Sequence, residues 1–174
     1  IPLRLVGSEM CIRDRLMIAL KDIEKSQLKW GSSVVQIGSL KNDKTACHNS
    51  VEKMLKELYA FDFGEVLFKP TRVSKKQFRL SFEGAKSYFV GNNPAYHEDK
   101  GFALHPWVDV KFENSSVILK EDHAIAMGNY YFTDPQGKEV KVEYTFGYMK
   151  DLNGNIKINL HHSSFPYNDD LYFE

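Results

Sequence analysis

Four strand-like segments separated by turn residues fill the second half of the chain, and this pattern limits the possible folds more than any other feature. The segments lie near residues 104–114, 122–133, 139–149 and 155–164. The connections are rich in residues typical of tight hairpin turns: Asn114-Ser115-Ser116, Asp134-Pro135-Gln136-Gly137 and Asn153-Gly154. The pattern therefore predicts an antiparallel meander.

Two segments that precede this region have the apolar spacing of amphipathic helices. The first covers about Leu16 to Gly38, and the second starts near Asn42 or Thr45 and runs to Tyr59. A short strand is expected at residues 65–69, ended by a proline. Residues 82–90 fit a short helix but contain a glycine, which leaves their structure open. Helices followed by a meander predict an α+β fold.

Residues 5–15 match one reading frame of a transposon-type sequencing-library adapter, so residues 1–15 are expected not to be native. We expect a single domain at residues 16–167 and a C-terminal tail at residues 168–174. Without the first 15 residues, the 23 basic and 23 acidic residues become 20 and 21. This near-neutral charge disfavours nucleic acid or an anionic membrane as a partner. No apolar run approaches the roughly 18 residues of a membrane-spanning helix.

The last strand-like segment places polar side chains at the end of an apolar face. Its alternate apolar residues are Ile156, Ile158 and Leu160. Because side chains two apart in a strand share a face, His162 and Ser164 are predicted to follow them into an enclosed cavity. His161 and Ser163 are then predicted to point the other way. Adjacent histidines on opposite faces cannot chelate one ion.

Thr71 and Tyr88 are further candidates, because each polar group lies beside apolar neighbours. Each also fits a structural role, Thr71 as a turn or cap residue and Tyr88 as a core aromatic, and an inward histidine is often only a hydrogen-bonded core residue. The histidines show no helical i, i+4 pair, and a zinc site assembled from distant strands stays open. Segment 122–133 is apolar on both faces, which predicts a cover of its second face by a partner subunit or the C-terminal tail.

Six sequence blocks, in this order, carry a family resemblance that covers about residues 18–167. The blocks are Val66-Leu67-Phe68-Lys69-Pro70-Thr71, Ser87-Tyr88-Phe89-Val90-Gly91, Asp99-Lys100-Gly101-Phe102-Ala103, Ala126-Met127-Gly128-Asn129-Tyr130-Tyr131-Phe132, Val142-Glu143-Tyr144-Thr145-Phe146-Gly147-Tyr148 and Leu160-His161-His162-Ser163-Ser164. Together they resemble the iota-class carbonic anhydrases. That class belongs to the superfamily of the calcium/calmodulin-dependent kinase II association domain and nuclear transport factor 2.

The resemblance implies a cone-shaped, curved antiparallel sheet packed against N-terminal helices, of the nuclear transport factor 2-like or SnoaL-like kind. It implies a lyase that interconverts carbon dioxide and bicarbonate, a homodimer, and a plastid or periplasmic location. In the metal-free members bicarbonate is held by hydroxyl groups, which match Thr71, Tyr88 and Ser164, with His162 near them. We expect His162 to accept or relay the proton, and no cofactor, with zinc or manganese left open.

Two other function classes fit the same fold. One is a non-catalytic oligomerisation or ligand-binding module of the kinase-association-domain type, because fold does not determine function. The other is chemistry of the ketosteroid-isomerase or polyketide-cyclase kind. It is disfavoured because no inward general-base aspartate is visible in the sequence. Carbon dioxide hydration by the purified protein separates the first class from an enzyme.

Overall fold

The computed structural model describes residues 17–168 of the chain. Within this range the helices are Leu20–Ser39 (α2), Lys44–Leu58 (α3), Phe82–Val90 (α4) and the short 3-10 helix Phe102–Leu104 (η1). The strands are Leu67–Lys69 (β1), Asp109–Leu119 (β2), His123–Thr133 (β3), Glu139–Lys150 (β4) and Ile156–Ser164 (β5). The predicted adapter segment and all of the predicted tail except Asn168 lie outside the described residues.

Two of the helices begin where a side chain can accept the free backbone N–H groups of the first turn. The Asp43 carboxylate accepts from the Ala46 N–H at 2.9 Å in α3, and the Ser81 hydroxyl accepts from the Gly84 N–H at 3.1 Å in α4. Residues 82–90, whose structure the sequence left open, are therefore helical. None of the helices within the described range has the length and apolar character to cross a bilayer.

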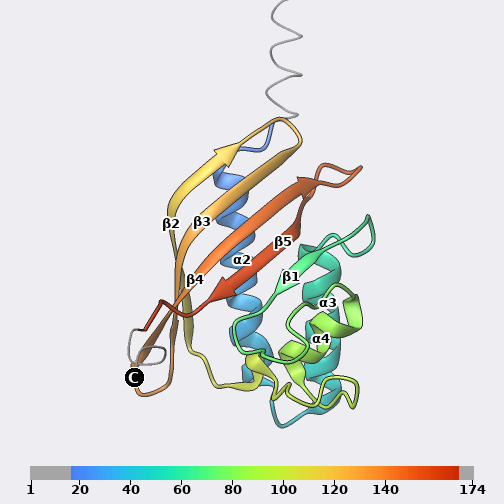
Figure 1. Ribbon diagram of the computed structural model, residues 1–174, viewed down its shortest axis with the longest axis vertical. Helices are drawn as coiled ribbons and strands as arrows, with labels where there is room; N and C mark the ends of the chain where they lie inside the picture. Colours follow the sequence, from blue (N-terminus) through green and yellow to red (C-terminus); the bar gives the residue numbers. More distant parts are fainter. Residues whose placement is uncertain (1–16, 169–174) are drawn as a thin grey trace, which may run out of the picture.

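The strands form one sheet in the order β1-β5-β4-β3-β2. β2, β3, β4 and β5 pair antiparallel in chain order, as the hairpin pattern predicts, whereas β1 pairs parallel with β5. The predicted α+β class is confirmed, with a mixed sheet in place of a purely antiparallel one. Figure 1 shows α2 running along one face of the bent sheet, with α3 and α4 near β1.

One predicted turn is wrong, because residues 114–116 continue β2 to Leu119. The pairing of β2 with β3 shifts register across Ser115, which is an extra residue and forms a β-bulge. A side chain at Gly128, opposite the bulge, would collide with the backbone carbonyl of Glu113. The polar, turn-like composition of this segment therefore marks a bend in a long strand.

Trp30 of α2 lies at the centre of an aromatic core between that helix and the sheet. Six rings pack edge-on against it at centroid distances from 5.6 to 6.2 Å: Phe89, Phe112, Tyr130, Phe132, Phe146 and His161. Edge-to-face contacts of this kind add to the stabilisation from apolar burial. Because His161 belongs to this core, the side of β5 that carries it faces the helices.

β3 has one buried face and one open face. Its buried side chains are Ala124, Ala126, Tyr130 and Phe132. On the opposite face Ile125 is 39% exposed and Met127 is 56% exposed. The sequence predicts a cover over this second face, and the described part of the chain does not provide one.

Candidate active site

The structure reverses the predicted faces of β5. His161 and Ser163 are each 2% exposed, whereas His162 is exposed and Ser164 is half-buried. His162 and Ser164 line a hollow on the outer face of the sheet, where the Ser164 hydroxyl donates to the Glu143 carboxylate at 3.2 Å. The prediction that His162 and Ser164 face the enclosed side is therefore wrong.

A β-bulge at Asn159 causes the reversal. Tyr148 of β4 pairs with Ile158 and Gly147 pairs with Leu160, so Asn159 is an extra residue opposite β4. One extra residue moves every later side chain to the other face of the strand. A side chain at Gly147 would lie 2.8 Å from the Leu160 Cβ, so the bulge needs a glycine there. An isolated glycine inside a strand is the sequence signal that could have revealed the bulge.

The end of β1 brings Thr71 beside Ser163. β1 lies alongside β5 with Phe68 level with His161, and Pro70 follows the last residue of the strand. Thr71 comes next, and its Oγ1 lies 3.0 Å from the Ser163 Oγ, within hydrogen-bond distance. Two hydroxyl groups that are 92 residues apart in the chain therefore meet at the edge of the aromatic core.

The Tyr88 side chain extends from α4 to the Thr71 hydroxyl. It is 5% exposed, and its hydroxyl lies against the Thr71 hydroxyl and the backbone N–H of Arg72. Burial raises the pKa of Tyr88 well above its ordinary value, and the contacts with Arg72 and Thr71 offset only part of this effect. Tyr88 therefore keeps its proton at neutral pH and can donate a hydrogen bond.

Tyr130 of β3 is a member of the cluster that sequence reasoning missed. Its hydroxyl interacts with the hydroxyls of Ser163 and Thr71 and lies 3.4 Å from the His161 Nε2. Burial raises the pKa of Tyr130 as well. In the sequence Tyr130 is part of segment 122–133, which is apolar on both faces. The sequence could have pointed to Tyr130, because a tyrosine on the buried face of a strand needs a polar partner for its hydroxyl.

His161 is enclosed by aromatic rings and by tyrosine hydroxyls. Its Nδ1 lies 2.8 Å from the Tyr59 hydroxyl, and its ring packs against Phe68 and Phe146 at centroid distances of 4.6 and 4.1 Å. Burial lowers the pKa of His161 well below its ordinary value of 6.5. The imidazole is therefore neutral at physiological pH.

A pocket of about 560 Å³ opens beside Tyr88. Its wall consists of the segment from Glu98 to Gly101, three residues of the η1 region and the side chains of Arg72 and Tyr88. Phe102 stacks on Tyr88 with ring centroids 5.4 Å apart. Tyr88 therefore lies between this pocket, which is lined by both apolar and charged residues, and the Thr71 hydroxyl.

The described residues offer no ligand set for a metal ion. Within residues 17–168 no three His, Cys, Asp or Glu side chains lie together as a group that could hold one. Both ring nitrogens of His161 already have tyrosine partners. The side chains of Thr71 and Ser163 meet through their hydroxyls, and the Lys69 ammonium group donates to the backbone carbonyl of Ser163 at 3.3 Å.

Comparison with known proteins decides the family. A family model described as metal-independent carbonic anhydrase matches residues 21–165. The chain belongs to the metal-independent carbonic anhydrases. A metal-independent carbonic anhydrase of Nostoc sp. (strain PCC 7120) is 39% identical over 153 residues, which are 86% of this chain and 75% of that protein.

Solved structures agree with this family. The iota-carbonic anhydrase from a cyanobacterium, in complex with bicarbonate, is 38% identical, with a TM-score of 0.84 over 88% of this chain and 95% of that one. A putative calcium/calmodulin-dependent protein kinase II association domain of Xanthomonas campestris is more distant. It is 28% identical, with a TM-score of 0.51 over 79% of this chain and 80% of that one. The predicted family, fold and activity are confirmed, and the non-catalytic alternative is not favoured.

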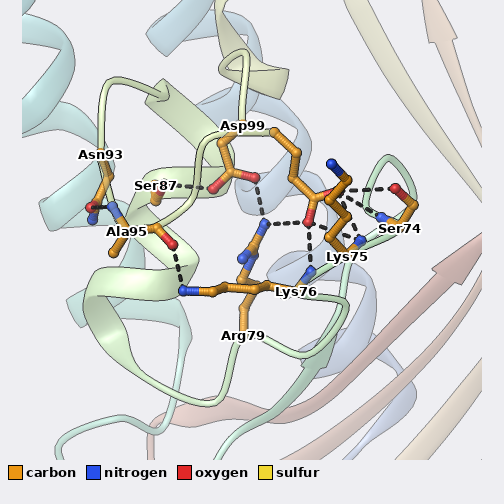
Figure 2. A network of polar contacts seen from close by, with 9 residues as sticks. Ser74, Lys75, Lys76, Arg79, Ser87, Asn93, Ala95 and Asp99 are labelled. Carbon is orange, nitrogen blue, oxygen red and sulfur yellow. Dashed lines mark hydrogen bonds and ion pairs between the residues drawn. The ribbon is translucent and has the colours of Figure 1, made fainter.

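In this carbonic anhydrase a buried ion pair fixes the helix that carries Tyr88. The Arg79 Nη2 lies 2.6 Å from the Asp99 Oδ1, and neither side chain is exposed to solvent. The other oxygen of Asp99 accepts a hydrogen bond from the Ser87 hydroxyl of α4, as Figure 2 shows. Burial raises the pKa of Asp99, and its contacts with Ser87 and Arg79 oppose this rise. Asp99 therefore links the wall of the pocket to Ser87, the residue that precedes Tyr88 in α4.

Glu98 of the carbonic anhydrase holds the loop after Thr71 against the pocket. Its carboxylate accepts the backbone N–H groups of Ser74, Lys75 and Lys76, at 2.8 Å from the first and the last. Figure 2 shows these three residues beside Arg79 and Asp99. The N–H groups lower the pKa of Glu98 to about 2. The negative charge of Glu98 therefore orders the loop.

Acid should release this loop contact. The folded-state pKa of Glu98 is about 2 against an ordinary value of 4.5, so its charge stabilises the fold above about pH 4.5, and this contribution is lost as the pH falls toward 2. We expect the thermal midpoint of Glu98→Gln to lie below that of the unchanged protein at neutral pH, with a gap that narrows in acid. Melting curves from pH 6 to 3 measure the gap. Glu121→Gln on the surface is the control, and a gap that does not depend on pH would contradict the assignment.

Proposed function

We propose that Thr71, Tyr88 and Ser163 bind carbon dioxide and bicarbonate in this carbonic anhydrase, without a metal ion. The contact of 3.0 Å between the Thr71 and Ser163 hydroxyls, with the Tyr88 hydroxyl against Thr71, carries the proposal. These hydroxyls can donate to an anion with three oxygens. The bicarbonate in the structure of the cyanobacterial relative supports the proposal. Ser163 takes the substrate-binding role first predicted for Ser164, and His161, in place of His162, is the histidine on the enclosed side of β5.

The reaction joins a water oxygen to the carbon of carbon dioxide and releases one proton, giving bicarbonate. Free water has a pKa near 15.7, and zinc enzymes lower that of a bound water to about 7. In this site, positioning and fixed donors supply the catalytic effect. The Thr71 and Ser163 hydroxyls orient the water, while the Tyr88 hydroxyl donates to the substrate oxygen on which negative charge develops.

Removing the Thr71 hydroxyl should slow carbon dioxide hydration while the fold stays intact. Thr71→Val keeps the side-chain shape, and the loss of one hydroxyl at the charged transition state should lower kcat/KM about 100-fold. Stopped-flow hydration measures the change. Thr145→Val, in the hollow on the outer face of the sheet, is the matched control. A loss equal to that of the control would mean that Thr71 is outside the active site.

We also infer that a second copy of the chain covers the open face of the sheet, as the family resemblance predicts. Ile118, Ile125 and Met127 present apolar surface there, with exposed fractions of 54%, 39% and 56%. A charged side chain at the centre of such a face would be desolvated in the dimer. The proposed dimer therefore accounts for an apolar pattern on both faces of β3.

Met127→Glu is expected to shift the proposed dimer to a monomer without unfolding it. Light scattering coupled to size exclusion gives the mass of each form. Leu152→Glu is the control because Leu152 is 98% exposed and lies in the turn between β4 and β5, outside the strands that carry Ile118, Ile125 and Met127. A monomeric unchanged protein would contradict the dimer.

Location in a plastid or a periplasm stays a prediction, which fractionation of the source cells would check.

A further inference from the structure

The direction of hydrogen bonding around His161 can be worked out from Trp30. The indole N–H of Trp30 lies 2.9 Å from the Tyr59 hydroxyl oxygen, and both side chains are buried. An indole N–H can only donate. The Tyr59 oxygen must therefore accept from Trp30, and the O–H of Tyr59 needs an acceptor elsewhere.

The acceptor for Tyr59 is the Nδ1 of His161, 2.8 Å away. Within residues 17–168 the Tyr59 hydroxyl has hydrogen-bond partners only in Trp30 and His161. A proton on Nδ1 would leave the Tyr59 O–H buried without an acceptor, which is costly. The neutral ring therefore carries its proton on Nε2.

The series of hydrogen-bond donors continues from His161 toward the proposed binding site. With its proton on Nε2, the ring donates to the Tyr130 hydroxyl at 3.4 Å. The Tyr130 O–H is then free to donate, and the hydroxyls of Ser163 and Thr71 are near enough to act on it. The donors Trp30, Tyr59 and His161 therefore all point in one direction, toward Tyr130.

We propose that Trp30 and Tyr59 hold His161 in its neutral Nε2–H tautomer, so that His161 is a positioning residue for the hydroxyl donors and not the general base. The proposal rests on the function proposed above for Thr71, Tyr88 and Ser163. An indole nitrogen cannot accept a proton, so a proton passed toward Tyr59 has no exit at Trp30. The proton released by hydration therefore does not leave along this series and passes to water or solvent buffer.

The tautomer can be observed directly by two-bond ¹H–¹⁵N correlation spectra of histidine-labelled protein. His161→Gln and His162→Gln assign the two neighbouring signals. The titratable groups that act on the His161 ring are Tyr59, Tyr130 and, through space, His162. We expect a neutral Nε2–H pattern that persists from about pH 5.5 to 8 in the unchanged protein, and a mixture of tautomers in Tyr59→Phe. An Nδ1–H pattern, or titration near about pH 6.5, would overturn the proposal.

Glutamine at position 161 separates positioning from proton transfer. Its amide can accept from Tyr59 and donate to Tyr130, but it cannot act as a base. We expect His161→Gln to lose at most about ten-fold in kcat/KM, and His161→Leu to lose more than about 100-fold. Equal, large losses in two folded variants, checked by circular dichroism, would overturn the proposal.

The same measurements distinguish a failure of the positioning role of His161 from a failure of the proposed binding site. If Thr71→Val is fully active while His161 shows the Nε2–H tautomer, the binding site has been misplaced and the direction of the donors stands. If Thr71→Val is impaired and His161 titrates as a base, the binding site stands and the positioning role fails.

Discussion

Replacing Ser163 with alanine is expected to lower kcat/KM for carbon dioxide hydration about 100-fold, which is the usual effect of removing one fixed donor at a charged transition state. Ser163 is 2% exposed, and its hydroxyl is within 3.0 Å of the Thr71 hydroxyl. Alanine leaves the backbone pairing of β5 unchanged, so the loss would report the hydroxyl. Stopped-flow hydration with a pH indicator gives the rate, and circular dichroism checks the fold.

Ser164→Ala is the matched control for this change. Ser164 lies on the same strand, one residue further on, but its hydroxyl donates to Glu143 on the outer face of the sheet. We expect Ser164→Ala to keep activity close to that of the unchanged protein. A larger loss in Ser164→Ala than in Ser163→Ala would show that β5 presents its other face to the substrate.

Breaking the ion pair between Arg79 and Asp99 should have the largest effect on stability. Both side chains are shielded from solvent, and Arg79→Met leaves the Asp99 carboxylate buried without its cation. Such a loss costs about 3–5 kcal/mol in the free energy of unfolding. Urea unfolding followed by circular dichroism measures it. Activity should fall as well, because Asp99 also accepts from Ser87, beside Tyr88.

Two further variants test whether burial explains this cost. Adding Asp99→Asn to Arg79→Met removes the unpaired charge and should restore part of the lost stability. Lys29→Met breaks an ion pair with Glu57 in which the side chains are 51% and 38% exposed, so it should cost at most about 1 kcal/mol. Equal costs for Arg79→Met and Lys29→Met would rule out the special role of burial.

The hairpin pattern was sufficient to predict the meander, because turn residues and alternating side chains are local signals. The sequence predicts a turn at Ser115 where the structure has a bulge, since the same small polar residues suit both structures. The parallel pairing of β1 with β5 could not be predicted from local pattern. It joins residues more than 90 positions apart, and a three-residue strand carries little periodic signal.

The sequence predicts Thr71 and Tyr88 as site residues, and the structure brings their hydroxyls close to that of Ser163. His162 and Ser164 were placed on the wrong face because one extra residue, Asn159, reverses the alternation of β5.

The tyrosine partners of His161 were not predicted at all. Tyr59 and Tyr130 look like core aromatics in the sequence, and only the fold shows that their hydroxyls meet the imidazole. A single sequence can indicate that a tyrosine is buried, but the partner of its hydroxyl depends on contacts between distant elements.

Catalysis by hydroxyl groups without a metal ion is tested most directly by stopped-flow carbon dioxide hydration on chelator-treated protein, with bound metal measured by mass spectrometry. The site of Thr71, Tyr88 and Ser163 predicts that hydration continues at an unchanged rate when far less than one metal ion per chain is present. Loss of activity on chelation, with recovery on addition of zinc or manganese, would contradict it.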